Sequence, residues 1–175
     1  SKKIVDDILN NDNSEIVLDP ALLYDFKNDT KLKKPRYKDY IAVYGVEFDE
    51  DFIEETIKYA RKNNLEIISI GYINKWCDRS IRMLELRTFE WLGLIKNAKC
   101  VATSMFHGLM VSISFNKEVK FNQVAYVKNR SQTLLKLLEI EENVSDFGLS
   151  IDYSIVNKKL DDLREISIEA LKEVL

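Results

Sequence analysis

The sequence predicts an α/β protein, a Rossmann-like three-layer αβα sandwich with a parallel sheet. Short apolar runs that end in glycine or a turn alternate with longer stretches whose apolar residues recur at helical spacing. A strand, a helix and a second strand also fit within about 30 residues, the size of a right-handed parallel βαβ unit. We therefore expect four strands, separated by helices, to run parallel.

Each predicted element follows from its own pattern. Apolar runs predict strands at residues 16–18, 40–44, 65–70, 99–103 and 119–121. Helical periodicity predicts helices at residues 2–10, 49–63, 89–95, 106–113, 130–138 and 155–175. Residues 72–80 are expected to form an irregular connection, and residues 25–38, rich in lysine, a loop. The last helix is expected to close the domain by packing across it.

The composition indicates one soluble-type domain that is long enough to bury a core. The chain has 175 residues, of which 46% are hydrophobic and 31% charged. A net charge of −3 argues against a nucleic-acid partner, because such surfaces carry a basic excess. No apolar run is long enough to cross a bilayer, and the N-terminus does not resemble a signal peptide.

Cysteine and histidine are scarce. Two cysteines provide neither a disulfide framework nor a metal motif, and a single histidine makes a histidine-based metal site unexpected. Together with the missing signal peptide, this favours a cytoplasmic protein, for which the inner face of the membrane is one place of action. The first residue is Ser1, so we expect the chain to be a piece of something longer.

The stretch from Ala98 to Ile113 is the strongest candidate for a functional site. A β-prone run leads directly into a helix, which puts the helix start at the carboxyl end of the sheet, where open α/β folds bind ligands. Ser104 is a good N-cap residue, His107 falls in the first turn, and Gly108 leaves room for a ligand. Free N–H groups and the helix dipole make such a turn an anion site. Local spacing alone favours the simpler interpretation, a capped helix whose first turn carries a packed histidine.

The same stretch resembles the Ser-Phe-His-Gly signature of the polysaccharide pyruvyl transferase family. The quoted residues are Thr103-Ser104-Met105-Phe106-His107-Gly108 and Ser112-Ile113-Ser114-Phe115. Residues 89–98 resemble the helix that precedes the signature, and residues 129–135 an Arg-x-x-x-Leu-Leu segment after it. Two residues depart from the family's pattern. Met105 stands where many members have serine or arginine, and Glu118 stands where many have proline.

The resemblance implies a two-lobed enzyme of glycosyltransferase-B type, of which this chain is mainly the C-terminal lobe. Residues 1–38 would then be an interlobe segment and residues 151–175 the closing helix. The implied reaction moves the pyruvyl group of phosphoenolpyruvate, with no cofactor, onto a sugar of a cell-surface polysaccharide as a cyclic ketal. The acceptor would be a sugar or a lipid-linked oligosaccharide, bound largely by the N-terminal lobe, so the chain alone is expected not to turn over.

The reaction needs an anion cradle, an acid for the methylene carbon and a base for the sugar hydroxyl. His107 is the candidate catalytic residue, and we expect one ligand to bridge His107 and Arg130 at one rim. The candidate donor-binding residues are Ser104, His107, Gly108, Asn129 and Arg130. Weaker candidates are Asp19, Ser112 and Lys117, for which a turn, a helix-surface hydroxyl and a helix C-cap are the structural alternatives. No metal ligands are expected.

Two other functions stay open at this point. A glycosyltransferase-B-like lobe would place the diphosphate of a nucleotide sugar at the same helix start, although no acidic residue stands in a clear ribose-binding position. A non-catalytic binding domain would keep the fold without the chemistry. The intact Ser-x-x-His-Gly with Arg130 argues against decay.

Overall fold

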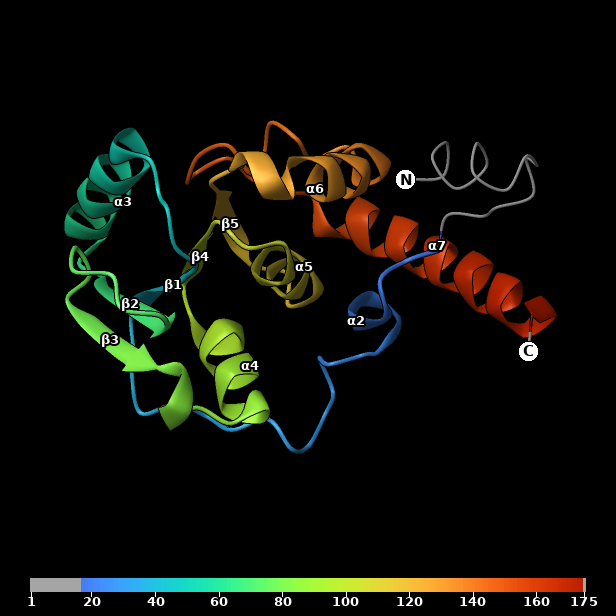
Figure 1. Ribbon diagram of the computed structural model, residues 1–175, viewed down its shortest axis with the longest axis horizontal. Coiled ribbons are helices and arrows are strands. Elements are labelled where there is room, and N and C mark those ends of the chain that lie inside the picture. The colour runs from blue at the N-terminus through green and yellow to red at the C-terminus, as the bar shows by residue number, and fades with distance from the viewer. Residues whose placement is uncertain (1–16, 175) are drawn as a thin grey trace.

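Five parallel strands form the centre of the fold, as a computed structural model shows (Figure 1). The structure describes residues 17–174, apart from the side chains of Tyr126 and Val174. The strands are β1 (Tyr40–Tyr44), β2 (Glu66–Gly71), β3 (Arg79–Arg82), β4 (Cys100–Thr103) and β5 (Glu118–Phe121), in the sheet order β3-β2-β1-β4-β5. The predicted Rossmann-like α/β fold is thus confirmed.

Helices flank both faces of this sheet. They are α2 (Pro20–Leu23), α3 (Glu50–Asn63), α4 (Thr88–Asn97), α5 (Phe106–Ser114), α6 (Ala125–Leu138) and α7 (Tyr153–Val174), with a 3₁₀ turn, η1 (Met83–Glu85). Figure 1 shows α3 on one side of the sheet and α4 and α5 on the other. None of the helices in the described part of the chain combines the length and apolar character needed to span a bilayer.

Alternating side chains of the strands divide the core between the two faces. Ile41 and Val43 of β1 pack with Phe52 of α3, whereas Tyr40 and Ala42 pack with the helices of the opposite face. The hydroxyl of Tyr40 is fully buried and donates to the carbonyl of Leu94 at 2.5 Å. Burial raises the pKa of this hydroxyl, which therefore stays protonated and keeps the bond.

A buried lysine holds the segment after α6 to α3. Lys120 of β5 is 1% exposed, and its ammonium group pairs with Glu55 of α3 and with Asp146, the latter at 3.1 Å. The same group lies 5.1 Å from the centre of the Phe52 ring. A buried charge needs partners of this kind, because desolvation alone would disfavour it.

The order of the strands fixes where a ligand can bind. From β1 the chain proceeds through α3 to β2 and β3, and then α4 carries it across to β4, on the other side of β1. Neighbours β1 and β4 pair in parallel register, with Tyr44 opposite Thr103. The loops that leave these two strands therefore diverge from one point at the carboxyl edge, where doubly wound sheets bind their ligands.

Three sequence predictions differ from the structure. Residues 79–82 form the edge strand β3, which the sequence did not reveal because Arg79 and Arg82 leave only Ile81 as an apolar residue in it. Val17 and Leu18, expected in a strand, lie in no strand, and the backbone N–H of Leu18 bonds instead to the Ser167 hydroxyl of α7. Ile16 and the predicted helix at residues 2–10 lie outside the described residues.

The third difference concerns α6, which begins at Ala125 rather than at Arg130. Asn122 to Val124 alone connect it to β5, which is a common length for such loops.

The predicted closing helix exists as α7, and Arg164 in it donates to the carbonyl of Leu22 at 2.6 Å. Helix α2 packs against both α5 and α7.

We expect Gly93→Ala in α4 to lower the free energy of unfolding by about 1–3 kcal/mol. A Cβ at this position would lie 1.9 Å from the carbonyl oxygen of Lys33, so the segment around Lys33 would have to move. Urea unfolding measures the loss. Glu54→Ala on the exposed face of α3 is the control, with a change near zero. Equal stability of the two variants would contradict this packing.

Candidate active site at the carboxyl edge

A cavity of about 320 Å³ lies beside His107 at the carboxyl edge of the sheet. Four elements place residues around it: Tyr44 ends β1, Met83 follows β3, Arg87 and Thr88 start α4, and His107 lies in the first turn of α5. Its other lining residues are apolar: Ala21, Phe26, Leu86, Trp91, Leu92 and Val111. An apolar cavity with a few converging polar groups is the usual form of a small-molecule site.

Two helices begin at this cavity. Met105 is the N-cap of α5, with extended backbone (φ −107°, ψ 136°) and no side-chain hydrogen bond that caps the helix. The first bond within the helix joins Leu109 N–H to the Met105 carbonyl. The N–H groups of Phe106, His107 and Gly108 donate to no acceptor in the described part of the chain. The start of α4 lies on the same cavity through Thr88. The Glu90 carboxylate already accepts from Arg87 N–H at the start of α4, so the uncapped start of α5 is the helix end that favours an anion here.

Ser104 does not cap α5, contrary to the sequence prediction. Its buried hydroxyl accepts a hydrogen bond from Val46 N–H at 3.1 Å and donates one to the Val46 carbonyl at 2.6 Å. A Cβ on Gly45, whose φ is +144°, would lie 2.2 Å from this hydroxyl oxygen. Ser104 thus fixes the loop after β1 against the turn after β4, and its only proton is already used.

Gly108 has a packing role in the turn. A Cβ at this position would lie 2.3 Å from Thr103 Oγ1 and 2.8 Å from the ring of Tyr44. Thr103 Oγ1 in turn donates to the Tyr44 carbonyl at 2.6 Å and accepts from Met105 N–H at 3.1 Å. The absence of a side chain at Gly108 lets α5 start directly on the ends of β4 and β1.

Two aromatic side chains form a wall of the cavity. The rings of Tyr44 and Trp91 meet edge to face with centres 4.9 Å apart, and the centre of the Tyr72 ring lies 5.5 Å from that of Tyr44. Burial, and then the neighbouring Tyr72, raise the pKa of Tyr44 to about 12, so its hydroxyl stays protonated at neutral pH. The buried indole N–H of Trp91 has no acceptor within the described residues.

Asn129 and Arg130 line a different cavity from His107. They lie within α6, and with Asp19 and Phe106 they border a groove of about 430 Å³ between α2, α6 and α7. His107 is absent from this groove, and Arg130 is absent from the His107 cavity. The geometry therefore gives no support to one ligand that bridges both residues, because Arg130 does not stand at a helix start on the same rim.

The three weaker candidates have structural partners. Asp19 is the N-cap of α2 and accepts from Ala21 N–H at 3.0 Å. The buried hydroxyl of Ser112 donates to the Gly108 carbonyl at 2.7 Å, one turn back in α5. Lys117 lies at the opposite edge, where it donates to the Ala98 carbonyl at 2.8 Å, so it caps α4 rather than α5. Burial lowers the pKa of Lys117.

Arg87 and Tyr44 are the residues that sequence reasoning missed. Arg87 is exposed, immediately precedes α4 and lines the His107 cavity. The strand pattern around Tyr44 was visible, but its place beside His107 depends on the pairing of β1 with β4. A basic residue just before the predicted helix at residues 89–95 was the one available signal for Arg87.

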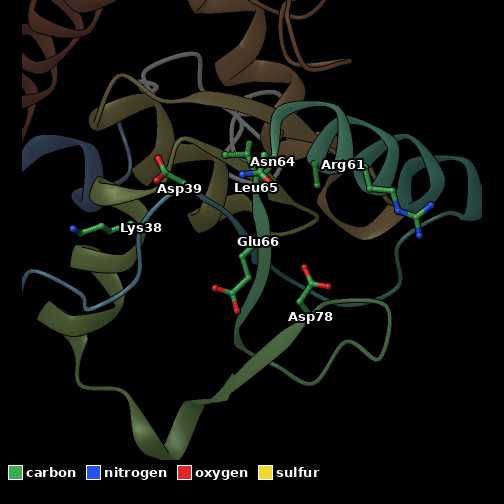
Figure 2. Close-up of a pocket in the computed structure, with 8 residues that line it drawn as sticks. Lys38, Asp39, Arg61, Asn64, Leu65, Glu66 and Asp78 are labelled. Atoms are coloured by element: carbon green, nitrogen blue, oxygen red, sulfur yellow. The ribbon is translucent and has the colours of Figure 1, made fainter.

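A larger hollow, of about 600 Å³, lies at the opposite, amino edge (Figure 2). Its three carboxylates have partners: Asp39 pairs with Lys99, Glu66 pairs with Arg79, and Asp78 accepts from the N–H of Ile67. Figure 2 shows the Arg61 side chain pointing away from them. Since the strands start at this edge, no helix N-terminus of a βα unit faces it, and its acids serve the fold.

These features define the class of protein: a Rossmann-like α/β protein whose carboxyl edge holds a cavity between two helix starts. The family model of polysaccharide pyruvyl transferase matches residues 1–119, more than half of the chain. The chain therefore belongs to the polysaccharide pyruvyl transferase family, as the resemblance predicted. No curated protein and no solved structure matches it. The matched range includes Tyr44, Arg87 and His107 and ends before Arg130.

We expect Ser104→Ala to lower the free energy of unfolding by about 1–3 kcal/mol, because it leaves both the N–H and the carbonyl of Val46 without their partner. Urea unfolding with the protein otherwise unchanged measures this. Ser154→Ala, at an exposed serine near the start of α7, is a matched hydroxyl deletion away from the site, with a smaller loss. A Ser104→Ala protein as stable as the parent would refute the positioning role.

Proposed function

We propose that this chain is the donor-binding lobe of an enzyme that transfers the pyruvyl group of phosphoenolpyruvate to a sugar of a cell-surface polysaccharide. The observation that carries the proposal is the position of His107, in the uncapped first turn of α5, on a cavity between two helix starts. Family membership implies a transferase and supports a sugar as the acceptor. The donor and the ketal product are part of the proposal.

The cavity suits the donor because phosphoenolpyruvate carries two anionic groups. The free N–H groups at Phe106, His107 and Gly108 are donors for one of them, and the helix dipole favours its charge. The exposed guanidinium of Arg87 can clamp the other in a bidentate pair. The aromatic wall of Tyr44 and Trp91 then excludes water from one side of the enol.

The chemistry can be written with His107 as the proton carrier. The imidazolium gives its proton to the methylene carbon, which becomes a methyl group and leaves the adjacent carbon electrophilic. A sugar hydroxyl adds to that carbon and loses its proton, the carbon–oxygen bond to phosphate breaks, and a second hydroxyl adds and loses its proton. One of the two released protons restores His107 and the other goes to the departing phosphate, so the products are the ketal and inorganic phosphate.

In this proposal the acceptor, a sugar or a lipid-linked oligosaccharide, is held largely by a second, N-terminal lobe, as in glycosyltransferase-B-type enzymes. His107 is exposed at the carboxyl edge, which leaves its imidazole accessible to a substrate that approaches from outside this chain. Residues 1–38 would belong to the segment between the lobes. This chain would then supply the donor side and the proton carrier.

We expect phosphoenolpyruvate to bind the chain and Arg87→Ala to weaken this binding about tenfold or more, since a hydrogen-bonded charge pair contributes about 1.5–3 kcal/mol. Isothermal titration calorimetry measures both. Lys58→Ala removes an exposed charge on α3 and is the control, with unchanged affinity. A nucleotide sugar that binds in place of phosphoenolpyruvate would favour the glycosyltransferase-B alternative, and binding of neither ligand would favour a non-catalytic domain.

We expect His107→Ala, in the enzyme with both lobes, to lower the rate of transfer by about 10²–10⁴-fold, the usual loss for a general acid or base. The melting temperature should hardly move, because the side chain is exposed and its removal changes stability by about 1 kcal/mol or less. Ketal formation and thermal unfolding are measured on the same variant. A destabilised His107→Ala enzyme with normal transfer would show a structural histidine instead.

A further inference from the structure

The turn between β3 and α4 exposes apolar side chains. Leu84, in the middle of η1, is 98% exposed, and its neighbour Met83 is 46% exposed. Single exposed leucines are common on soluble proteins and need no explanation by themselves. The residues near Leu84 are unusual because they carry an excess of positive charge.

A basic segment lies beside the turn. Five of the eight residues at 31–38 are basic and none is acidic, in a chain whose net charge is −3. The segment is held against α4, since Lys33 N–H donates to the Phe89 carbonyl at 3.2 Å and the Lys31 ammonium lies 5.6 Å from the Phe89 ring. Lys33, Lys34 and Arg36 share a cavity of about 700 Å³ with Glu85 and Leu86. Figure 1 shows the segment, in blue, passing the lower end of α4.

The positive charge of this surface is only partly neutralised. Glu85 pairs with Arg82 at 2.7 Å, and the Glu90 carboxylate accepts from the backbone N–H of Arg87. Lys33 and Lys34, both exposed, form no ion pair within the described residues. Hereafter the basic turn surface means Lys31, Lys33, Lys34, Arg36, Met83 and Leu84.

We propose that the basic turn surface docks on an anionic lipid bilayer. Lysines and arginines near such a bilayer gain electrostatic attraction, and apolar side chains between them insert at the boundary of headgroups and acyl chains. A soluble polyanion would use the charges but would gain nothing from Leu84. The combination of a fully exposed leucine with unpaired lysines therefore selects a bilayer over a polyanion.

The basic turn surface lies next to the His107 cavity. Met83 and Leu86 also line the His107 cavity, together with Arg87. A bilayer that holds Leu84 therefore lies next to the mouth of that cavity, within reach of a substrate anchored in the same membrane. The docking itself does not depend on the reaction proposed above, because it follows from exposure and charge alone.

Co-sedimentation of the chain with vesicles tests the proposal. Vesicles of equimolar phosphatidylglycerol and phosphatidylcholine should bind it, whereas pure phosphatidylcholine vesicles should not. Lys33→Glu with Lys34→Glu should weaken binding roughly 25-fold or more, at about fivefold for each lysine. Leu84→Ser should weaken it about tenfold. The control, Lys58→Glu with Lys158→Glu, makes the same change of charge at exposed helix positions elsewhere and should lose much less.

Circular dichroism of each variant verifies that the fold is intact. Binding to both kinds of vesicle alike, or to neither, would overturn the proposal. It would also be overturned by a charge variant that loses no more than its control. If Leu84→Ser binds like the parent while the Lys33 and Lys34 variant does not, the surface is a polyanion site and the bilayer proposal is wrong.

Discussion

The contact between the loop after β1 and the turn after β4 is the constraint on which the site depends. Two hydrogen bonds between the Ser104 hydroxyl and the backbone of Val46, one accepted and one donated by the hydroxyl, hold these segments together, and Gly45 leaves the space for that hydroxyl. The two segments leave neighbouring strands at the point where the chain order of the sheet reverses. With this contact fixed, α5 starts at one place and in one direction, and His107 is carried to the cavity beside α4.

The elements around that contact support different parts of the proposed work. The uncapped start of α5 supplies a positive helix end, Arg87 supplies an exposed positive charge, and Tyr44 with Trp91 closes one wall. The proton chemistry is left to His107. Leu86, just after the turn at Met83 and Leu84, lines both the His107 cavity and the cavity beside the basic segment, so donor binding and membrane docking would share one short connection in the fold.

The sequence predicted the elements that carry an internal pattern and missed those that depend on tertiary contacts. Strands β1, β2, β4 and β5 are apolar runs, and α3, α4 and α5 have clear helical periodicity, so the fold class followed directly. Strand β3, which pairs with β2, was missed because its arginines break the apolar pattern that predicts a strand. The separation of Arg130 from His107 could not be predicted either, since it depends on where α2 and α7 pack. Tyr44 joins the site because β1 and β4 are neighbours, and Arg87 joins it because α4 packs against α5.

The division of roles within the Ser-x-x-His-Gly stretch affects how far such a match can be used to infer chemistry. Ser104 and Gly108 determine the shape of the turn, and only His107 reaches the cavity. A sequence match to this stretch therefore mainly indicates that the turn between strand and helix is retained. A protein could keep the serine and the glycine for the sake of the turn after the reaction had been lost. Whether a similar chain is a transferase is thus better judged from the single imidazole and its neighbours across the cavity than from the length of the match.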